Sequence, residues 1–284
     1  MKILKSVSGI QKALEKERKG GKTIGFIPTM GALHMGHMSL VKKSVKENDI
    51  TVVSVFVNPT QFNQKEDLEK YPRNLKADAK LLKQFDCNYI FAPGVNQIYP
   101  KNIDTSVDLD INHLVQSMEG PNRPGHFEGV VQVVKRLLDI VEPEKIYMGQ
   151  KDFQQFSIIG YMLKKLKMKT KLRVCPIIRE EDGLAMSSRN VRLAKKHRSL
   201  CTIIHQNLKY TKDNLGKRST KYLEKKAMES MSVKPFKPEY FEIVDGKTME
   251  RVKKPENHKL IVACTAVWAG KVRLIDNMIL KGRV

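Results

Sequence analysis

Strand and helix patterns alternate along the first 178 residues, and this alternation limits the fold more strongly than any other feature of the sequence. Short apolar runs at 23–28 and 51–57 flank a segment, 36–48, whose apolar side chains recur at helical spacing. This unit has about 35 residues, the size of a βαβ crossover. Continued alternation predicts a parallel sheet with helices on both faces. The other elements expected here are helices at 76–85, 127–140 and 153–166 and strands at 88–92, 145–148 and 170–178.

The pattern changes after a turn signal at residues 181–183, Glu-Asp-Gly. Helical stretches near 194–215 and 220–230 precede strand-like runs at 240–244, 260–266 and 272–275. Helices followed by a group of strands favour a smaller α+β domain. We therefore expect two domains, residues 1–184 and residues 185–284.

The charge balance is the feature of composition that bears most on function. The 284 residues include 52 Lys and Arg against 30 Asp and Glu, a net charge of +22. Such a field attracts anions, from small carboxylates and nucleotides to nucleic acid. Because the basic residues are spread along the chain and form no basic arm, we expect no specific nucleic-acid partner.

Two further features bear on cellular location. No window approaches about 18 uninterrupted apolar residues, and the N-terminus lacks the apolar centre of a signal peptide, so no membrane partner is expected. The four cysteines are scattered and form neither a C-x-x-C pair nor a zinc-type cluster; they are Cys87, Cys175, Cys201 and Cys264. Reduced, mostly buried thiols in a cytoplasmic protein are expected.

The segment PTMGALHMGH, residues 28–37, carries the clearest chemical signal. It follows the first predicted strand of the βαβ unit and opens a helix, and a helix N-terminus presents unpaired N–H groups to phosphate. His34 and His37 are three residues apart and fall on one face of the first turn. Their imidazoles can donate hydrogen bonds to a negatively charged pentacovalent phosphorus. A capped or packed histidine is the alternative, but two histidines in one short segment with Gly31 and Gly36 favour a nucleotide site.

The four residues His-Met-Gly-His resemble the H-x-G-H signature of the nucleotidyltransferase and class I aminoacyl-tRNA synthetase superfamily. The longer string resembles one family within it, the pantothenate synthetases (pantoate–β-alanine ligases). Further segments of that family recur in order along nearly the whole chain. They are FVNPTQF at 56–62, YPR at 71–73, RPGHF at 123–127, GQKDFQQ at 149–155, DGLAMSSRN at 182–190 and RLIDN at 273–277.

The resemblance implies a two-step ligase of vitamin B5 and coenzyme A biosynthesis. The carboxylate of pantoate attacks the α-phosphate of ATP, which gives pantoyl adenylate and pyrophosphate. The amine of β-alanine then attacks the adenylate, which gives pantothenate and AMP. The family also implies Mg²⁺ with the ATP, a homodimer, and a Rossmann-like N-terminal domain with a smaller C-terminal domain that closes as a lid. Because acyl adenylates hydrolyse readily, such a lid would exclude water.

The same resemblance assigns catalytic roles to charged and polar residues. His34 and His37 contact the phosphates, with His37 the proton donor, and Lys151 places a positive charge on a phosphate. The segment Ser187, Ser188 and Arg189 stands where the synthetases have a mobile KMSKS loop that holds the triphosphate. The full ATP-binding set implied is Met30, Gly31, Ala32, Leu33, His34, Met35, Gly36, His37, Gly149, Gln150, Lys151, Asp152, Ile178, Met186, Ser187, Ser188 and Arg189.

Neutral amides suit the hydroxyl and carboxylate groups of pantoate, and the resemblance assigns Gln61 and Gln155 to it, with Gln61 also near β-alanine. The other expected substrate-binding residues are Asn58, Tyr71, Arg123 and His126. The metal-binding residues stay unknown. Asp78 or a neighbouring carboxylate is one candidate, and ATP's own oxygens are the other.

Two other functions are compatible with parts of the sequence. One is a different H-x-G-H nucleotidyltransferase that condenses a phosphate ester with a nucleotide. The other is an RNA-binding relative of the synthetases, which the charge suggests. The basic residues lack the aromatic interleaving used for stacking on bases, and this disfavours RNA binding.

Overall fold

The structure is a computed structural model that describes residues 1–62 and 65–284. The described chain forms two compact units, each discontinuous in sequence. The first contains Met1–Leu109, Pro124–Gly149 and Ile158–Cys175. The second contains Asp110–Arg123, Gln150–Ser157 and Pro176–Val284.

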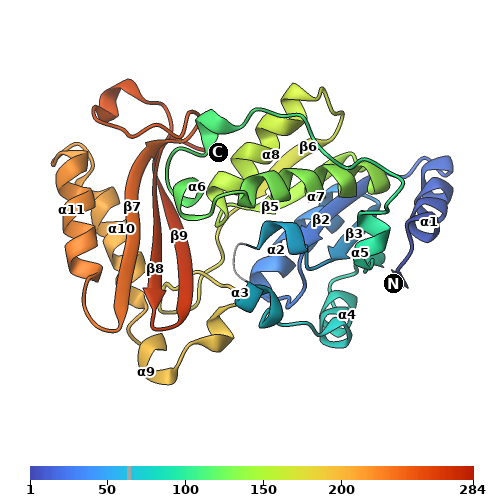
Figure 1. Ribbon diagram of the computed structural model, residues 1–284, viewed down its shortest axis with the longest axis horizontal. Helices are drawn as coiled ribbons and strands as arrows, with labels where there is room; N and C mark the ends of the chain where they lie inside the picture. The colour runs from blue at the N-terminus through green and yellow to red at the C-terminus, as the bar shows by residue number, and fades with distance from the viewer. Residues whose placement is uncertain (63–64) are drawn as a thin grey trace. The chain divides into compact units, whose positions relative to one another are not determined.

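A six-stranded parallel sheet forms the first unit (Figure 1). Its strands lie in the order β1-β4-β3-β2-β5-β6. The inner strands β2, β3 and β4 are buried along nearly their whole length, as expected of strands covered on both faces. Their bounds are β1 (Lys2–Leu4), β2 (Ile24–Thr29), β3 (Ile50–Val55), β4 (Tyr89–Phe91), β5 (Lys145–Gly149) and β6 (Lys171–Cys175).

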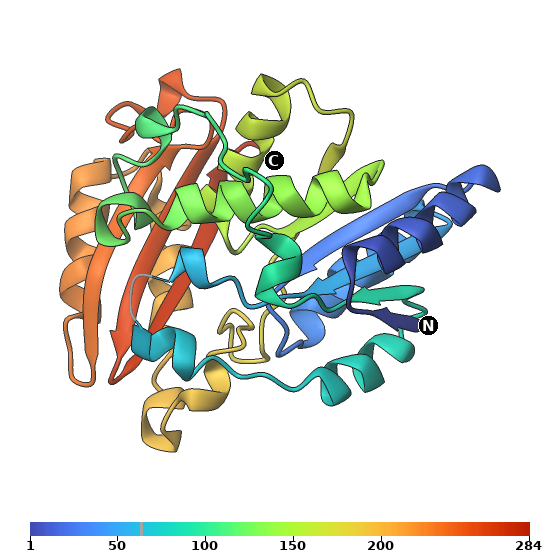
Figure 2. The ribbon, with the colours of Figure 1, turned by 45° about the vertical axis from the view of Figure 1, so that its right-hand side comes forward.

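Helices cover both faces of this sheet (Figure 2). Ile27 and Val53 pack in one cluster with apolar side chains of α2 (Met35–Glu47) and α4 (Leu75–Lys83). Because side chains alternate along a strand, the fully buried Phe26 and Val52 face the other way. On that side α7 (His126–Val141) contacts β2 and α1 (Val7–Lys19). The remaining helices are α3 (Lys65–Glu69), α5 (Val95–Ile98), the 3₁₀ turn η1 (Pro59–Gln61) and α8 (Phe153–Lys165), whose first residues belong to the second unit.

The strand order reverses direction at β2, and this feature positions the site. From β2 the chain goes to β3 on one side, whereas β5 and β6 extend the sheet on the other side. In open parallel sheets, ligands bind outside the carboxyl ends of the strands at such a switch point. Met30 follows β2 directly, and Gly149 is the last residue of β5.

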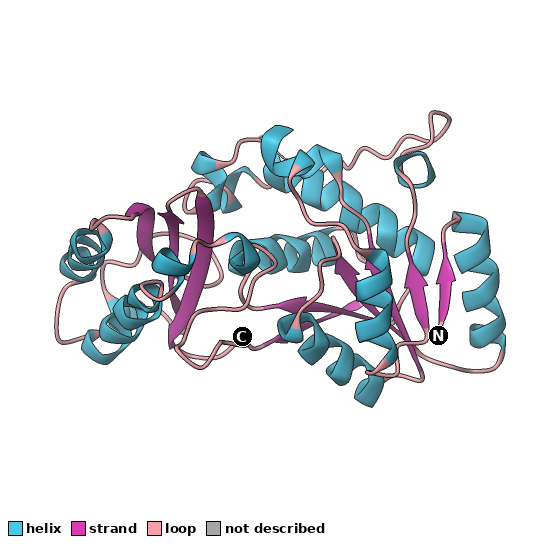
Figure 3. Ribbon diagram, turned by 90° about the horizontal axis from the view of Figure 1, so that it is seen from below, coloured by secondary structure: helices cyan, strands magenta, loops and turns pink. Residues whose placement is uncertain are grey.

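An antiparallel sheet and two helices form the second unit (Figure 3). The sheet order is β7 (Phe236–Asp245), β8 (Ile261–Ala269) and β9 (Val272–Lys281). The helices α10 (Thr202–Asn214) and α11 (Thr220–Met231) pack on it around buried residues such as Leu208, Leu223 and Ile243. Short elements complete the unit: η2 (Asn112–Leu114), α6 (Glu119–Asn122), η3 (Asn190–Arg192), α9 (Lys195–Arg198) and η4 (Pro255–Asn257).

The predicted α/β fold with a smaller C-terminal α+β part is confirmed, and most predicted elements are present within a few residues. Three differences have local causes. The strand β1 and the helix α1 were not predicted. The edge strand β1 has three residues, too few to show a period, and α1 buries only Ile10 and Leu14 in a charged sequence. The predicted strand at 170–178 ends at Cys175, where Pro176 follows. The strands β7 and β9 of the second unit are longer than predicted, because charged residues such as Glu239 and Asp276 interrupt their apolar pattern.

All four cysteines are buried and unpaired with one another. In the described ranges, the helices are too short or too polar to cross a membrane.

Gly129 permits a close approach that places η1 against α7. A Cβ atom at Gly129 would lie 2.5 Å from the carbonyl oxygen of Thr60 and 3.0 Å from the backbone nitrogen of Gln61. We expect Gly129→Ala to lower the free energy of unfolding by about 1–3 kcal/mol through overpacking, although alanine favours helices. Gly160→Ala in α8 is the matched control, since its Cβ would meet only a Leu172 methyl at 3.3 Å. Denaturant titration measures both, and equal stability of the two variants would contradict this packing.

Candidate active site

The loop after β2 is held in shape by the carboxylate of Asp78. Gly31 and Ala32 adopt positive φ angles of 82° and 50°. The backbone N–H groups of Ala32 and Leu33 donate to Asp78 at 3.1 and 2.8 Å. Asp78 is only 3% exposed; burial raises its pKa above the usual value, and these two hydrogen bonds partly oppose that rise. A buried carboxylate from α4 therefore fixes the turn that leads into α2.

His34 and His37 form a reciprocal cap at the start of α2. The Nδ1 of His34 accepts from the N–H of Gly36 at 3.1 Å, and the Nδ1 of His37 accepts from the N–H of His34 at 3.3 Å. The two rings lie 4.1 Å apart. These bonds assign the proton of each neutral imidazole to Nε2. His34 is thus a helix cap, as the alternative interpretation held, and the cap uses its Nδ1 and not its Nε2.

A second polar group in the first unit surrounds Asn58 and Gln61, both buried. The Asn58 amide donates to Gln61 Oε1 and to the Gly129 carbonyl, each at 3.2 Å. Its own oxygen accepts from the Tyr99 hydroxyl at 2.8 Å. His126 Nδ1 lies 2.8 Å from the backbone oxygen of Gln61. Three of the expected substrate-binding residues therefore meet at η1 and the start of α7.

Met30 and Tyr71 extend this group. The Gln61 amide nitrogen lies 3.2 Å from the sulfur of Met30, which links the polar group to the loop after β2. Tyr71 is buried and packs edge-on against Phe62, with ring centroids 5.8 Å apart. The first unit thus places some of the residues expected for phosphate and some of those expected for pantoate near the loop after β2.

In the second unit, residues 150–152 continue directly from the end of β5. Lys151 is partly exposed and Asp152 exposed, one residue before α8. The side chain of Asn277 in β9 donates to the backbone oxygens of both Gln150 and Lys151. The backbone that carries the Lys151 ammonium group is therefore fixed from a different part of the fold.

The segment 178–190 forms a second loop in this unit. The N–H of Met186 donates to the Ile178 carbonyl at 3.0 Å, so these two expected ATP-site residues are brought together. The Ser187 hydroxyl accepts from the N–H of Arg189 at 3.2 Å, and Ser188 lies between them. The turn at Ser187–Arg189 is half-buried, which suits a loop that binds a ligand from solvent.

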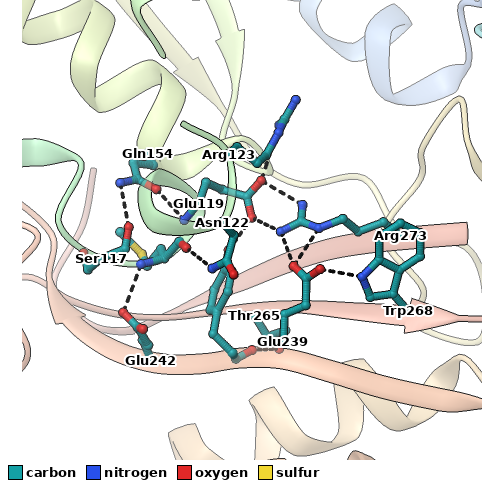
Figure 4. Close-up of polar contacts among 12 residues, drawn as sticks. Ser117, Glu119, Asn122, Arg123, Gln154, Glu239, Glu242, Thr265, Trp268 and Arg273 are labelled. Carbon is teal, nitrogen blue, oxygen red and sulfur yellow. Dashed lines mark hydrogen bonds and ion pairs between the residues drawn. The ribbon is translucent and has the colours of Figure 1, made fainter. Parts of the chain in front are cut away.

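An ion-pair network centred on the buried Glu119 holds residues 119–123, the segment that contains Arg123 (Figure 4). Glu119 accepts from both terminal nitrogens of Arg273, at 2.9 and 2.8 Å, and from the Tyr240 hydroxyl at 2.8 Å. Arg273 also binds Glu239, whereas Arg123 approaches Glu119 at 3.4 Å. Burial raises the pKa of Glu119, but the bonds and charge of Arg273 outweigh it and hold this pKa at about 2.

Gln154, at the start of α8, completes this network. It accepts from the Glu119 N–H at 2.9 Å and donates to the carbonyls of Leu114 and Ser117 at 2.7 and 3.1 Å. The neighbouring Gln155, an expected pantoate-binding residue, is half-buried. The structure therefore separates two adjacent glutamines: Gln154 is used in the scaffold, and Gln155 keeps partial access to solvent.

The expected site residues divide between the two units. The first holds those of 30–37, Asn58, Gln61, Tyr71, His126 and Gly149, and the second holds those of 150–152, Gln155, Arg123 and 178–189. Sequence reasoning gave no role to Glu119, Gln154, Asp276 or Asn277, although three of these stand in the quoted family strings. Each has main partners 35 or more positions away in the sequence, so spacing alone gave no signal.

Comparison with known proteins shows the family that the chain resembles along nearly its whole length. The family model described as "Pantoate-beta-alanine ligase" matches residues 2–279. A pantothenate synthetase of Bacteroides thetaiotaomicron is 47% identical over 279 residues, 98% of each chain. One from Pseudothermotoga lettingae is 47% identical over 284 residues, 99% of each chain.

Solved structures show the same relationship. Pantothenate synthetase from Thermus thermophilus matches with a TM-score of 0.92 at 36% identity, over 99% of this chain and 100% of that one. Pantoate-beta-alanine ligase from Francisella tularensis, in a complex with "Beta-gamma ATP and Beta-alanine", matches with a TM-score of 0.80 at 33% identity, over 99% and 98%.

The depressed pKa of Glu119 predicts acid sensitivity. Its folded pKa lies below the unfolded value of about 4.3, so its stabilisation is complete above that pH and is lost as the pH falls toward 2. We expect Glu119→Gln to cost on the order of 3 kcal/mol at pH 7, because a buried ion pair is broken, and to flatten the pH dependence below pH 5. Unfolding titrations between pH 3 and 7 measure this.

The exposed Glu229, which pairs with Lys225, supplies the matched control as Glu229→Gln. The expected result is a pH profile like that of the unchanged protein. Parallel profiles for Glu119→Gln and the unchanged protein would show that Glu119 does not carry the acid sensitivity.

Proposed function

The chain belongs to the pantoate–β-alanine ligase family, and we propose specific roles for its residues in the two steps of that reaction. In the first step a carboxylate oxygen of pantoate attacks the α-phosphorus of ATP, and the bond to pyrophosphate breaks. In the second step the β-alanine nitrogen attacks the acyl carbon, the bond to AMP breaks, and the nitrogen loses a proton. The products are pantothenate, AMP and pyrophosphate.

The reciprocal histidine pair at the start of α2 is the observation that carries this proposal. With both Nδ1 atoms accepting backbone N–H groups, the proton of each ring is on Nε2, and both rings stand at the positive end of the helix. Negative charge grows on the α-phosphate and on the leaving pyrophosphate in the first step. Donors fixed before the reaction stabilise that charge without reorganisation. We assign His34 and His37 to the phosphates as Nε2–H hydrogen-bond donors; the proton-donor role expected of His37 is replaced by hydrogen bonding, because a neutral imidazole whose Nδ1 is an acceptor has no second proton to transfer.

Cations and hydroxyls of the second unit supply the other phosphate contacts in this proposal. Lys151 places a point charge on a phosphate. Ser187, Ser188 and Arg189 offer two hydroxyls and a planar guanidinium, which stays charged at any working pH. Asp152 lies beside Lys151 in sequence and is assigned to the ATP ribose or to orienting Lys151.

Pantoate is assigned to the amide-rich group of the first unit. Gln61 and Asn58 are buried and already oriented by their mutual hydrogen bond, so binding would cost little side-chain entropy. His126 and Tyr71 belong to the same assignment, with Gln155 and Arg123 of the second unit. Neutral amides recognise hydroxyls and a carboxylate without pairing so strongly with the carboxylate that its attack is suppressed.

Mg²⁺ is part of the family's chemistry, and the described side chains offer it no protein cage. The described residues contain no group of three or more His, Cys, Asp or Glu placed to hold a metal ion. Asp78 uses its two oxygens to hold the loop of Ala32 and Leu33. Mg²⁺ commonly keeps several waters and binds through substrate phosphates. We assign it to the oxygens of ATP.

Three further expectations form part of the proposal. The functional division is residues 1–184 and 185–284, with the second acting as a lid; it differs from the two compact units, because 110–123, 150–157 and 176–184 group with the second unit. The protein is a cytoplasmic homodimer, and its partners are its small-molecule substrates. Buried unpaired thiols at all four cysteines support a reducing compartment.

Omitting one substrate at a time tests the reaction. AMP release should require ATP, pantoate and β-alanine together, whereas pyrophosphate exchange into ATP should require pantoate but not β-alanine. A phosphate ester should not replace pantoate. Exchange that a phosphate ester supports and pantoate does not would identify a different nucleotidyltransferase.

The histidine assignment predicts a selective loss of adenylate formation. His37→Asn keeps an acceptor where Nδ1 stands and removes the Nε2–H donor. We expect His37→Asn and His37→Ala to slow adenylate formation by about 10²-fold or more, with the fold intact. Pyrophosphate exchange measures adenylate formation, and circular dichroism checks that the fold is intact. Near-normal exchange in His37→Asn would remove this residue from the phosphate site.

The assignment of Lys151 to a phosphate predicts a loss of adenylate formation similar to that of the His37 variants. Lys151→Ala should slow adenylate formation by about 10²-fold. Lys164→Ala, at an exposed lysine in the last turn of α8, is the matched control and should exchange pyrophosphate at the normal rate. Equal rates in the two variants would show that the Lys151 charge is not used.

A further inference from the structure

The motif RLIDN, residues 273–277, has no role in the proposed chemistry, yet it ends in two buried polar side chains. Asp276 and Asn277 lie in β9 and are 3% and 1% exposed. Buried polar side chains are kept where their hydrogen bonds are complete. The partners of these two residues therefore indicate what the motif holds.

Asn277 binds the backbone that carries Lys151. Its Nδ2 donates to the carbonyl oxygens of Gln150 and Lys151 at 2.9 and 2.8 Å. Its Oδ1 accepts from the side-chain amide of Gln150 at 3.2 Å. Both amide hydrogens and the oxygen are used. The side chain therefore fixes the position and the direction of two successive peptide groups.

Asp276 holds the other loop through Arg179. The two carboxylate oxygens accept from Arg179 at 2.6 and 3.0 Å, a bidentate pair. The same guanidinium donates to the carbonyls of Gly183 and Asn277 at 2.9 and 3.2 Å. Gly183 precedes the segment that leads to Ser187, Ser188 and Arg189. One strand thus reaches both loops of the second unit to which phosphate contacts are assigned.

We propose that Asp276 and Asn277 are positioning residues that hold the Lys151 loop and the 179–189 loop in one fixed arrangement for the adenylation step. This inference rests on the proposed phosphate roles of Lys151 and of Ser187–Arg189. A lysine side chain is long and flexible, so its charge acts at a defined point only when its backbone is fixed. A displacement of about 1 Å at a reacting group costs about 10²-fold in rate.

The strand itself suits this role. β9 pairs with β8 along its length, and Asp276 and Asn277 lie opposite Thr265 and Cys264 within that pairing. Sites supported by strands are held more accurately than sites supported by loops alone. Both loops are therefore held by the same strand, β9.

Three variants test the proposal. Asn277→Ala removes both donations to the Lys151 loop, and Asn277→Asp places a carboxylate against two carbonyl oxygens. Asp276→Asn keeps the size of the side chain and removes the charge that pairs with Arg179. Because it alters the other loop, it stays informative even where both Asn277 variants fold poorly.

Thr220→Val is the matched control. Thr220 is buried in the same unit and donates to the carbonyl of Val252 at 2.6 Å, so its loss also removes a buried link to the backbone. That link touches neither loop. Thermal unfolding of every variant measures the purely structural cost.

The two half-reactions are then measured separately. Adenylation is followed as pyrophosphate release with ATP and pantoate alone. Aminolysis is followed by adding β-alanine after the adenylate has formed on the enzyme. We expect the folded Asn277 and Asp276 variants to slow adenylation by about 10- to 100-fold and aminolysis by less than about threefold. Thr220→Val should change neither rate.

Each other outcome has a defined meaning. Parallel losses in both half-reactions, or unchanged adenylation in a folded variant, would overturn the positioning role. Lys151→Ala is measured beside them. If it slows adenylation and the β9 variants do not, only the positioning inference fails. If Lys151→Ala has no effect, the proposed phosphate role of Lys151 fails first.

Discussion

The reversal of strand order at β2 is the constraint on which the first unit's site depends. Because all six strands are parallel, their carboxyl ends share one edge of the sheet. At β2 the neighbouring connections leave in opposite directions, which opens that edge beside the loop that follows. Asp78 fixes this loop, and α2 begins with two mutually bonded histidines. The sheet thus supplies the position, and short-range hydrogen bonds supply the orientation of the donors.

In the second unit, positive charge is fixed in place by ion pairs between arginine and carboxylate side chains. The chain carries a net charge of +22, but most of its cations are surface lysines, and few are fixed by several bonds. Two of those that are fixed are Arg273, paired with Glu119 and Glu239, and Arg179, paired with Asp276. The carboxylates of Glu119 and Asp276 are buried, their arginine partners are half-buried, and the pairs support loops, so they act as scaffold. Removing one partner is costly, because the other charge stays buried.

The fold was largely predictable from the sequence because its elements have strong local patterns. An apolar run such as 51–57 predicts a strand, and an apolar stripe such as that of α7 predicts a helix. Alternation of strands and helices along the chain predicts a parallel sheet. The histidine pair was predictable for the same reason, since both residues lie within one turn. Local patterns fail for β1, with three residues at the sheet edge, and for α1, which buries two side chains. The supporting residues were not predictable, because their partners are distant in the sequence. Asn277 bonds residues 126 and 127 positions away, and Glu119 bonds Arg273 at a separation of 154.

The protonation pattern of the histidine pair tests the central claim most directly. Nitrogen-15 NMR of the imidazole rings, with and without a non-hydrolysable ATP analogue, distinguishes Nδ1 from Nε2. We predict that the analogue shifts the Nε2 signals of His34 and His37 while their Nδ1 atoms remain unprotonated acceptors. Saturating binding of the analogue with no change at either Nε2 would contradict the proposed phosphate site.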